Sequence, residues 1–186
     1  LVQLWGSDFH GRHDVAGETA ARLRMPLFAI SAEDVPANPS EIEALATLCE
    51  REATLQGAAL LIECAETPGA NVIRFAERVD SLVFLAATAP LPLTRMDLRY
   101  RVEKPSGGDQ RQLWQQALGP EAASGGRALD MVAAEFRLSA RDVGRAAQQA
   151  LLEPGEVPLD MALSRACRDL DRTRLFRLPH RLGAGA

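Results

Sequence analysis

The first hundred residues alternate short apolar runs with segments in which apolar residues recur at helical spacing. A strand of a parallel sheet that is buried on both faces is apolar throughout, and a helix must cross between two such strands. The pattern therefore predicts an α/β fold with an open, parallel, five-stranded sheet flanked by helices. We expect its strands at residues 1–5, 27–30, 58–62 and 82–86, with an edge strand at 98–103.

The pattern changes at Pro105, after which only helical spacing remains. Ser139 stands where a helix N-cap is expected, with Asp142 three residues later. We expect an α/β domain over residues 1–104, a small all-helical domain over 105–175 and a flexible tail over 176–186. The predicted helices of the second domain cover roughly residues 109–118, 127–136, 139–152 and 159–172.

Residues 6–13 follow the first strand and have the spacing of a phosphate-binding loop, G-x-x-x-x-G-K-[ST]. Gly6 and Gly11 stand at its two glycine positions, where the backbone can turn tightly and direct N–H groups at an anion. Arg12 replaces the lysine that contacts phosphates, and His13 replaces the hydroxyl that binds magnesium. We expect a helix from about residue 13 to 24. An ordinary strand-to-helix turn remains the alternative. We expect Arg12 and His13 to be solvated residues of the first helical turn and not catalytic ones.

The segment Leu60-Leu61-Ile62-Glu63-Cys64 resembles a Walker B strand, in which four apolar residues precede Asp-Glu. With the glycine turn, the further strands and the helical appendix, the chain resembles the AAA+ ATPases, a family of P-loop NTPases, over about residues 1–175. In that resemblance Glu63 replaces the metal-associated Asp, and Cys64 replaces the Glu that activates water. Thr88, after the next strand, corresponds to the polar residue called sensor 1.

The resemblance also implies a sensor 2 arginine in the helical lid, for which Arg141 is the candidate and Arg145 the weaker one. Arg95 is the only basic residue between Thr88 and the last strand, but nothing in the sequence makes it an arginine finger. His10 and His13 have no third ligand at a spacing suited to a metal. Glu63 could contact a magnesium ion or cap a neighbouring loop.

Phosphoryl transfer depends on positioning and on stabilising charge at the γ-phosphate. Four substitutions, at positions 12, 13, 63 and 64, leave no route to efficient hydrolysis, although the glycine turn and the helix dipole could still bind an anion. The resemblance thus implies ATP or ADP with Mg²⁺ as ligand, bound weakly or not at all.

Three interpretations follow from these residues. The first, which we favour, is an inactive assembly or regulatory module, resembling the degenerate N-terminal module of a two-module AAA family ATPase, with other AAA modules or ring neighbours as partners. The second is a working AAA+ ATPase that uses Arg12 for phosphates and Glu63 for the metal. The third is an unrelated doubly wound α/β protein with a helical extension.

Composition excludes some functions. A net charge of −4 in 186 residues argues against a general nucleic-acid binder, and the sequence has no apolar run of the roughly 18–20 residues that a membrane span needs. The three cysteines are widely spaced and fit a reducing cytoplasm better than a disulfide framework. The chain starts with Leu1, so we expect a piece of a longer protein.

Overall fold

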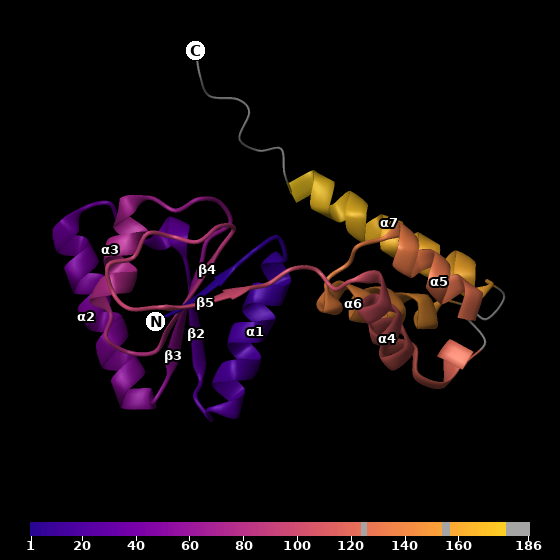
Figure 1. Ribbon diagram of the computed structural model, residues 1–186, viewed down its shortest axis with the longest axis horizontal. Coiled ribbons are helices and arrows are strands. Elements are labelled where there is room, and N and C mark those ends of the chain that lie inside the picture. The colour runs from indigo at the N-terminus through magenta and orange to yellow at the C-terminus, as the bar shows by residue number, and fades with distance from the viewer. Residues whose placement is uncertain (124–125, 154–156, 178–186) are drawn as a thin grey trace, which may run out of the picture. The chain divides into compact units, whose positions relative to one another are not determined.

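The computed structural model describes residues 1–123, 126–153 and 157–177. It divides into two compact units, Leu1–Glu103 and Lys104–Ala186 (Figure 1). The division falls where the sequence changes from alternating strands and helices to helices alone. Residues 178–186, which make up most of the predicted flexible tail, lie outside the described residues.

The first unit is an open, parallel, five-stranded sheet flanked by helices, as predicted. The strand order is β2-β3-β4-β1-β5, so β1 lies between β4 and β5, and all four strand pairs are parallel. Its elements are β1 (Val2–Trp5), α1 (Phe9–Arg22), β2 (Leu27–Ser31), a 3-10 turn (Ala32–Asp34), α2 (Pro39–Gln56), β3 (Ala59–Glu63), α3 (Ala70–Arg78), β4 (Val83–Ala87) and β5 (Leu98–Arg101).

The sheet is covered by α1 on one face and by α2 and α3 on the other (Figure 1). Successive residues of a strand point to opposite faces, and β3 uses both. Leu60 and Ile62 belong to the core under α2 and α3, whereas Leu61 packs in the core under α1. This two-sided burial explains the uninterrupted apolar run of the sequence.

The helix ends of this unit follow local rules with one informative exception. Helix α2 begins after Asn38, whose side chain accepts a hydrogen bond from the Ser40 amide, and ends at Gly57 in the left-handed conformation, as the sequence indicates. Helix α1 begins at Phe9, so the predicted start near residue 13 is wrong by about one turn. The cause is Asp8, which caps the helix early.

The second unit is all-helical, as predicted, and consists of α4 (Gly107–Leu118), a 3-10 turn (Gly119–Ala123), α5 (Gly126–Glu135), α6 (Ala140–Leu152) and α7 (Leu159–Arg177). Its core surrounds Trp114, which is fully buried. Ser139 caps α6 as predicted, and α7 continues to Arg177, five residues beyond the predicted end. Among the described residues, none of the helices combines the length and the apolar composition that a bilayer span requires.

Candidate functional site

The structure brings most of the sequence-predicted site residues to one edge of the sheet. Gly6, Cys64 and Thr88 each directly follow a strand, at the carboxyl edge where open α/β sheets bind ligands. The Gly6 amide donates to the Ala87 carbonyl oxygen at 3.2 Å, and the Cys64 amide donates to the Ala86 carbonyl oxygen at 2.8 Å. The ends of β1, β3 and β4 are therefore joined in one small region.

The N-terminus of α1 is occupied by a side chain of the chain itself. The Asp8 carboxylate is buried and its Oδ1 accepts a hydrogen bond of 3.0 Å from the Gly11 amide. A Cβ at position 11 would lie 2.6 Å from Asp8 Oδ2, so a larger residue there would require the carboxylate to shift. Only Gly6, Ser7 and Asp8 separate β1 from α1. Gly11 therefore lies in the first turn of α1.

Gly6 has a second structural requirement. Its φ is +140°, in the region that favours glycine, and a Cβ there would lie 2.2 Å from the Val102 carbonyl oxygen. The Asp8 amide donates to the same carbonyl oxygen at 3.4 Å. Gly6 is thus required by a backbone contact within the chain, whereas Gly11 meets only the side chain of Asp8.

The expectation of a solvated Arg12 is wrong, because the side chain is only 1% exposed. Its Nη1 donates to the Gly6 carbonyl oxygen, and its Nη2 donates to the Cys64 carbonyl oxygen at 3.4 Å. Its guanidinium carbon lies 5.5 Å from the centroid of the Phe9 ring. Burial lowers the pKa of the guanidinium, and the nearby Cys64, Asp8 and Glu63 act in the opposite direction. Arginine nevertheless stays charged in proteins.

The structure pairs His13 with Glu63. His13 Nδ1 lies 2.8 Å from Glu63 Oε1, and their side chains are 36% and 25% exposed. In the AAA+ resemblance these positions would hold a hydroxyl and a carboxylate that share one magnesium ion. Here the two side chains bind each other. Within residues 1–123, 126–153 and 157–177, no group of three or more His, Cys, Asp or Glu side chains is arranged to hold a metal.

Cys64 and Thr88 occupy the remaining two positions of the resemblance. Cys64 is buried, and this burial raises the pKa of its thiol to about 11, with Arg12 lowering and Glu63 raising it to smaller extents. The thiol is therefore protonated at neutral pH and packs as a small apolar group. Thr88 is exposed at the end of β4.

The arginines proposed for other roles belong to different elements. Arg141 is exposed in the first turn of α6, and Arg145 lies one turn later, both in the helical unit. Arg95 donates from Nη1 to the Val79 carbonyl oxygen at 2.7 Å and lies 3.7 Å from Asp80. These contacts tie Arg95 to the end of α3.

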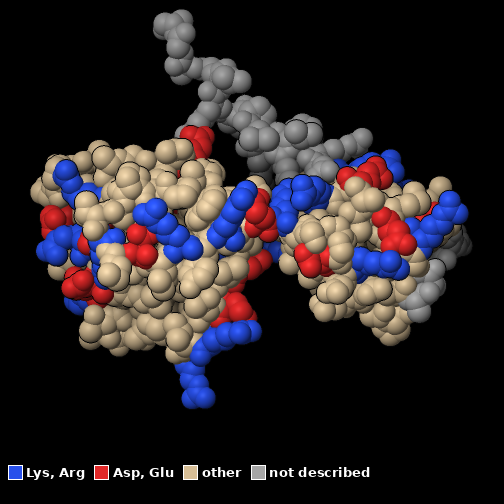
Figure 2. Space-filling view, viewed as in Figure 1, with Lys and Arg blue, Asp and Glu red and all other residues tan. Residues whose placement is uncertain are grey.

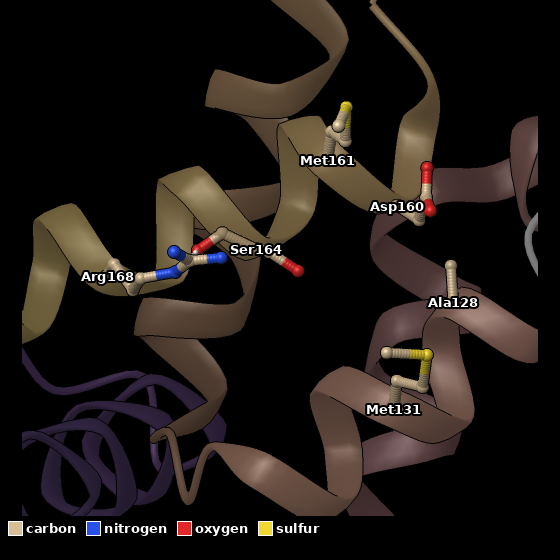
Figure 3. A pocket seen from close by; sticks show the side chains of 6 residues that line it. All are labelled: Ala128, Met131, Asp160, Met161, Ser164 and Arg168. Atoms are coloured by element: carbon tan, nitrogen blue, oxygen red, sulfur yellow. Dashed lines mark hydrogen bonds between the residues drawn. The ribbon is translucent and has the colours of Figure 1, made fainter.

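The helical unit has a shallow cavity of about 100 Å³ between α5 and α7 (Figure 3). Pockets for small ligands typically enclose about 300–1,000 Å³, so this cavity is too small for a nucleotide. The side chains that line it are Ala128, Met131, Asp160, Met161, Ser164 and Arg168.

Charged side chains of both signs are interspersed over the face shown in Figure 2, in each unit. Among the described residues drawn there, Lys and Arg form no continuous stripe of the kind that follows a nucleic-acid backbone. This distribution agrees with the small net charge of the chain.

The fold combines a P-loop-like parallel sheet with an all-helical part. Residues 106–173, which span most of the helical unit and fewer than half of the chain, match the family model of the contractile injection system ATPase helical domain. The match is consistent with a member of an ATPase family. No curated protein matches the chain.

The sequence indicates which residues lie at the sheet edge, but it does not reveal the residues that form hydrogen bonds with them. The cap of α1 by Asp8 could have been predicted from the sequence, because an Asp three residues before Gly11 is a typical helix cap. Val102 and Glu103, which contact the turn after β1, carry no local signal. Their role depends on the pairing of β1 with β5.

Proposed function

We propose that this chain is an inactive, AAA+-type ATPase module with an assembly or regulatory role in a contractile injection system ATPase. The family match of the helical unit supports the contractile injection system context. The parallel sheet with its helical appendix supports the ATPase-like architecture. The contacts at the carboxyl edge of the sheet support the loss of nucleotide chemistry.

The observation that carries this proposal is that the anion-binding groups are already bonded within the chain. The Asp8 carboxylate accepts from the Gly11 amide at the positive end of α1. A phosphate entering this position would have to displace the carboxylate or lie beside it, and two anions at one helix end repel each other. Arg12, buried and bonded to two carbonyl oxygens, cannot turn toward a phosphate without breaking both bonds.

The catalytic side of the site supports the same interpretation. His13 and Glu63 bind each other where magnesium would be held, so a metal would have to break a hydrogen bond of 2.8 Å. The Cys64 thiol, with a pKa of about 11, is no general base for water at neutral pH. The chain thus lacks a group that would activate the attacking water at this position.

On this proposal the partners are other AAA modules, in the same polypeptide or as ring neighbours, and an active module among them supplies hydrolysis. The chain then contributes a neighbour that does not hydrolyse nucleotide itself. Sequencing the gene beyond the codon for residue 186 tests one form of this idea, because a second module with an intact Walker A motif should follow. A native C-terminus at Ala186 would exclude that form.

The direct test is a titration of the purified chain with a fluorescent ATP analogue, with and without Mg²⁺, beside an intact P-loop ATPase as positive control. We expect no saturable binding at millimolar nucleotide and no Mg²⁺-dependent phosphate release. Asp8→Ala and the matched cap variant Asn38→Ala, at α2, should each cost about 1 kcal/mol of stability. Any weak nucleotide affinity that appears should appear with the Asp8 variant alone.

The working-ATPase interpretation makes the opposite prediction. Micromolar, Mg²⁺-dependent binding by the unmodified chain, lost in a folded Arg12→Met variant, would establish Arg12 as a phosphate ligand and refute our proposal. Circular dichroism and a thermal melt show whether that variant is folded.

A further inference from the structure

Burial of side chains contributes little to holding strand β5, the last strand of the α/β unit, in place. It forms one edge of the sheet, and all four of its side chains are exposed, including Leu98 at 58% and Tyr100 at 55%. Its apolar side chains therefore contribute little hydrophobic stabilisation. The ladder to β1 and the contacts at its C-terminal end must hold it in place.

The last residue of β1 and the turn after it, Gly6–Asp8, make the backbone contacts at that end. The Val102 amide donates to the Trp5 carbonyl oxygen at 2.7 Å, and the Asp8 amide donates back to the Val102 carbonyl oxygen at 3.4 Å. Gly6 packs so closely on Val102 that its missing Cβ would lie 2.2 Å from that oxygen. A side chain at position 6 would force the two segments apart.

Side chains reinforce the same contact. The Ser7 hydroxyl donates to Glu103 Oε2, and Arg101 Nε donates to Glu103 Oε1 at 2.8 Å. The Arg101 guanidinium also lies over the Trp5 ring, 5.2 Å from its centroid. Glu103 is thus bonded from the turn after β1 and from β5.

We propose that Gly6–Asp8 acts as a clamp on Val102–Glu103, the last residues of the α/β unit, and confines the connection between the two units to Lys104 and Pro105. The helical unit begins with a capping box at Ser106 and Asp109, so the chain is fixed again directly after Pro105. Proline fixes its own φ and restricts the residue before it to extended conformations. The connection therefore has very few free torsions.

The clamp gives the turn after β1 a conformational role. In a nucleotide-binding site this turn would contact phosphate, whereas here it contacts the segment that leads into the helical unit. Anything that moves the turn loosens that segment. The inference rests on these contacts alone and does not depend on the proposed function.

Backbone amide exchange in the full chain tests the clamp. Gly6→Ala should raise the exchange rates of amides at 98–103 by about tenfold or more, because the new Cβ cannot coexist with the Val102 carbonyl. Gly57→Ala is the matched control, since Gly57 also has a positive φ, +60°, but has no atom within 4 Å of the added Cβ. It should leave residues 98–103 unchanged.

A second variant keeps the test valid if Gly6→Ala fails to fold. Ser7→Ala combined with Glu103→Gln removes one side-chain contact and one charge, and should raise the same rates about threefold to tenfold. Lys104 is the single lysine of the sequence, so its acylation, mapped by mass spectrometry, reports specifically on the connection and should accelerate in parallel.

Exchange at 98–103 that stays within twofold of the unmodified chain in a folded Gly6→Ala protein, or in the double variant, would overturn the clamp. Nucleotide binding by the unmodified chain would refute the proposed function and leave the clamp intact, so the two failures are distinguishable.

Discussion

Replacing Arg12 separates a structural from a phosphate-binding role. Arg12→Ala removes two hydrogen bonds from a buried guanidinium, to the carbonyl oxygens of Gly6 and Cys64. Bonds of a charged donor contribute about 1.5–3 kcal/mol each. Part of this is recovered, because the variant no longer buries a charge whose Nε has no partner among the described residues. We expect a net loss of about 3 kcal/mol in the free energy of unfolding.

Two further substitutions separate the contributions of this side chain. Arg12→Met keeps most of the aliphatic volume and isolates the guanidinium. Arg12→Lys restores the lysine of the phosphate-loop motif, but a lysine lacks the planar fork that reaches two carbonyl oxygens. We expect Arg12→Lys to lose about 1–2 kcal/mol and to gain no nucleotide affinity, because Asp8 still caps α1.

The assay is urea denaturation followed by tryptophan fluorescence. Trp5 lies in the α/β unit and Trp114 in the helical unit, so a Trp114→Phe background makes the signal specific for the unit that contains Arg12. The units can unfold separately, and this background avoids a mixed transition. A loss below about 1 kcal/mol in Arg12→Ala, or micromolar ATP binding by Arg12→Lys, would refute the structural role.

Three other outcomes follow from the contacts of the α/β unit. Because burial raises the pKa of the folded Cys64 thiol, the thiol contributes stability that is complete below pH 9 and is lost as the pH rises to about 11. The free energy of unfolding, measured by urea denaturation across this pH range, should therefore fall by about 2–3 kcal/mol. The Cys64→Ala variant should not show this decline. Gln3→Leu leaves both the amide and the carbonyl oxygen of Leu91 without their partner and should lower the free energy of unfolding by about 2–4 kcal/mol in urea denaturation. An unchanged free energy of unfolding would mean that these two hydrogen bonds do not stabilise the fold. His13→Ala should cost no more than about 1 kcal/mol, because its pair with Glu63 is partly exposed, and a thermal melt showing a much larger loss would mean that the pair is more than a surface contact.

Much of the fold could be predicted because it depends on local patterns. The run Leu60–Ile62 indicated a central strand, since only burial on both faces tolerates three consecutive large apolar residues. Asn38 and Gly57 marked the ends of α2 through short-range capping, which the structure confirms. The start of α1 was missed although its cap, Asp8, is equally local, because the glycine spacing suggested a longer loop.

The sequence by itself determined which residues reach the carboxyl edge of the sheet, because strand ends follow from hydrophobic periodicity. Only the tertiary structure decided what those residues bind. Gly6 requires glycine because of Val102, and Arg12 is bonded to Cys64, so both partners lie far along the chain. Charged and polar groups take whatever partners the packed fold brings within hydrogen-bond distance, and burial makes an unpaired group costly. The same glycine spacing can therefore bind a phosphate in one chain, whereas in this chain the Gly11 amide donates a hydrogen bond to the Asp8 carboxylate.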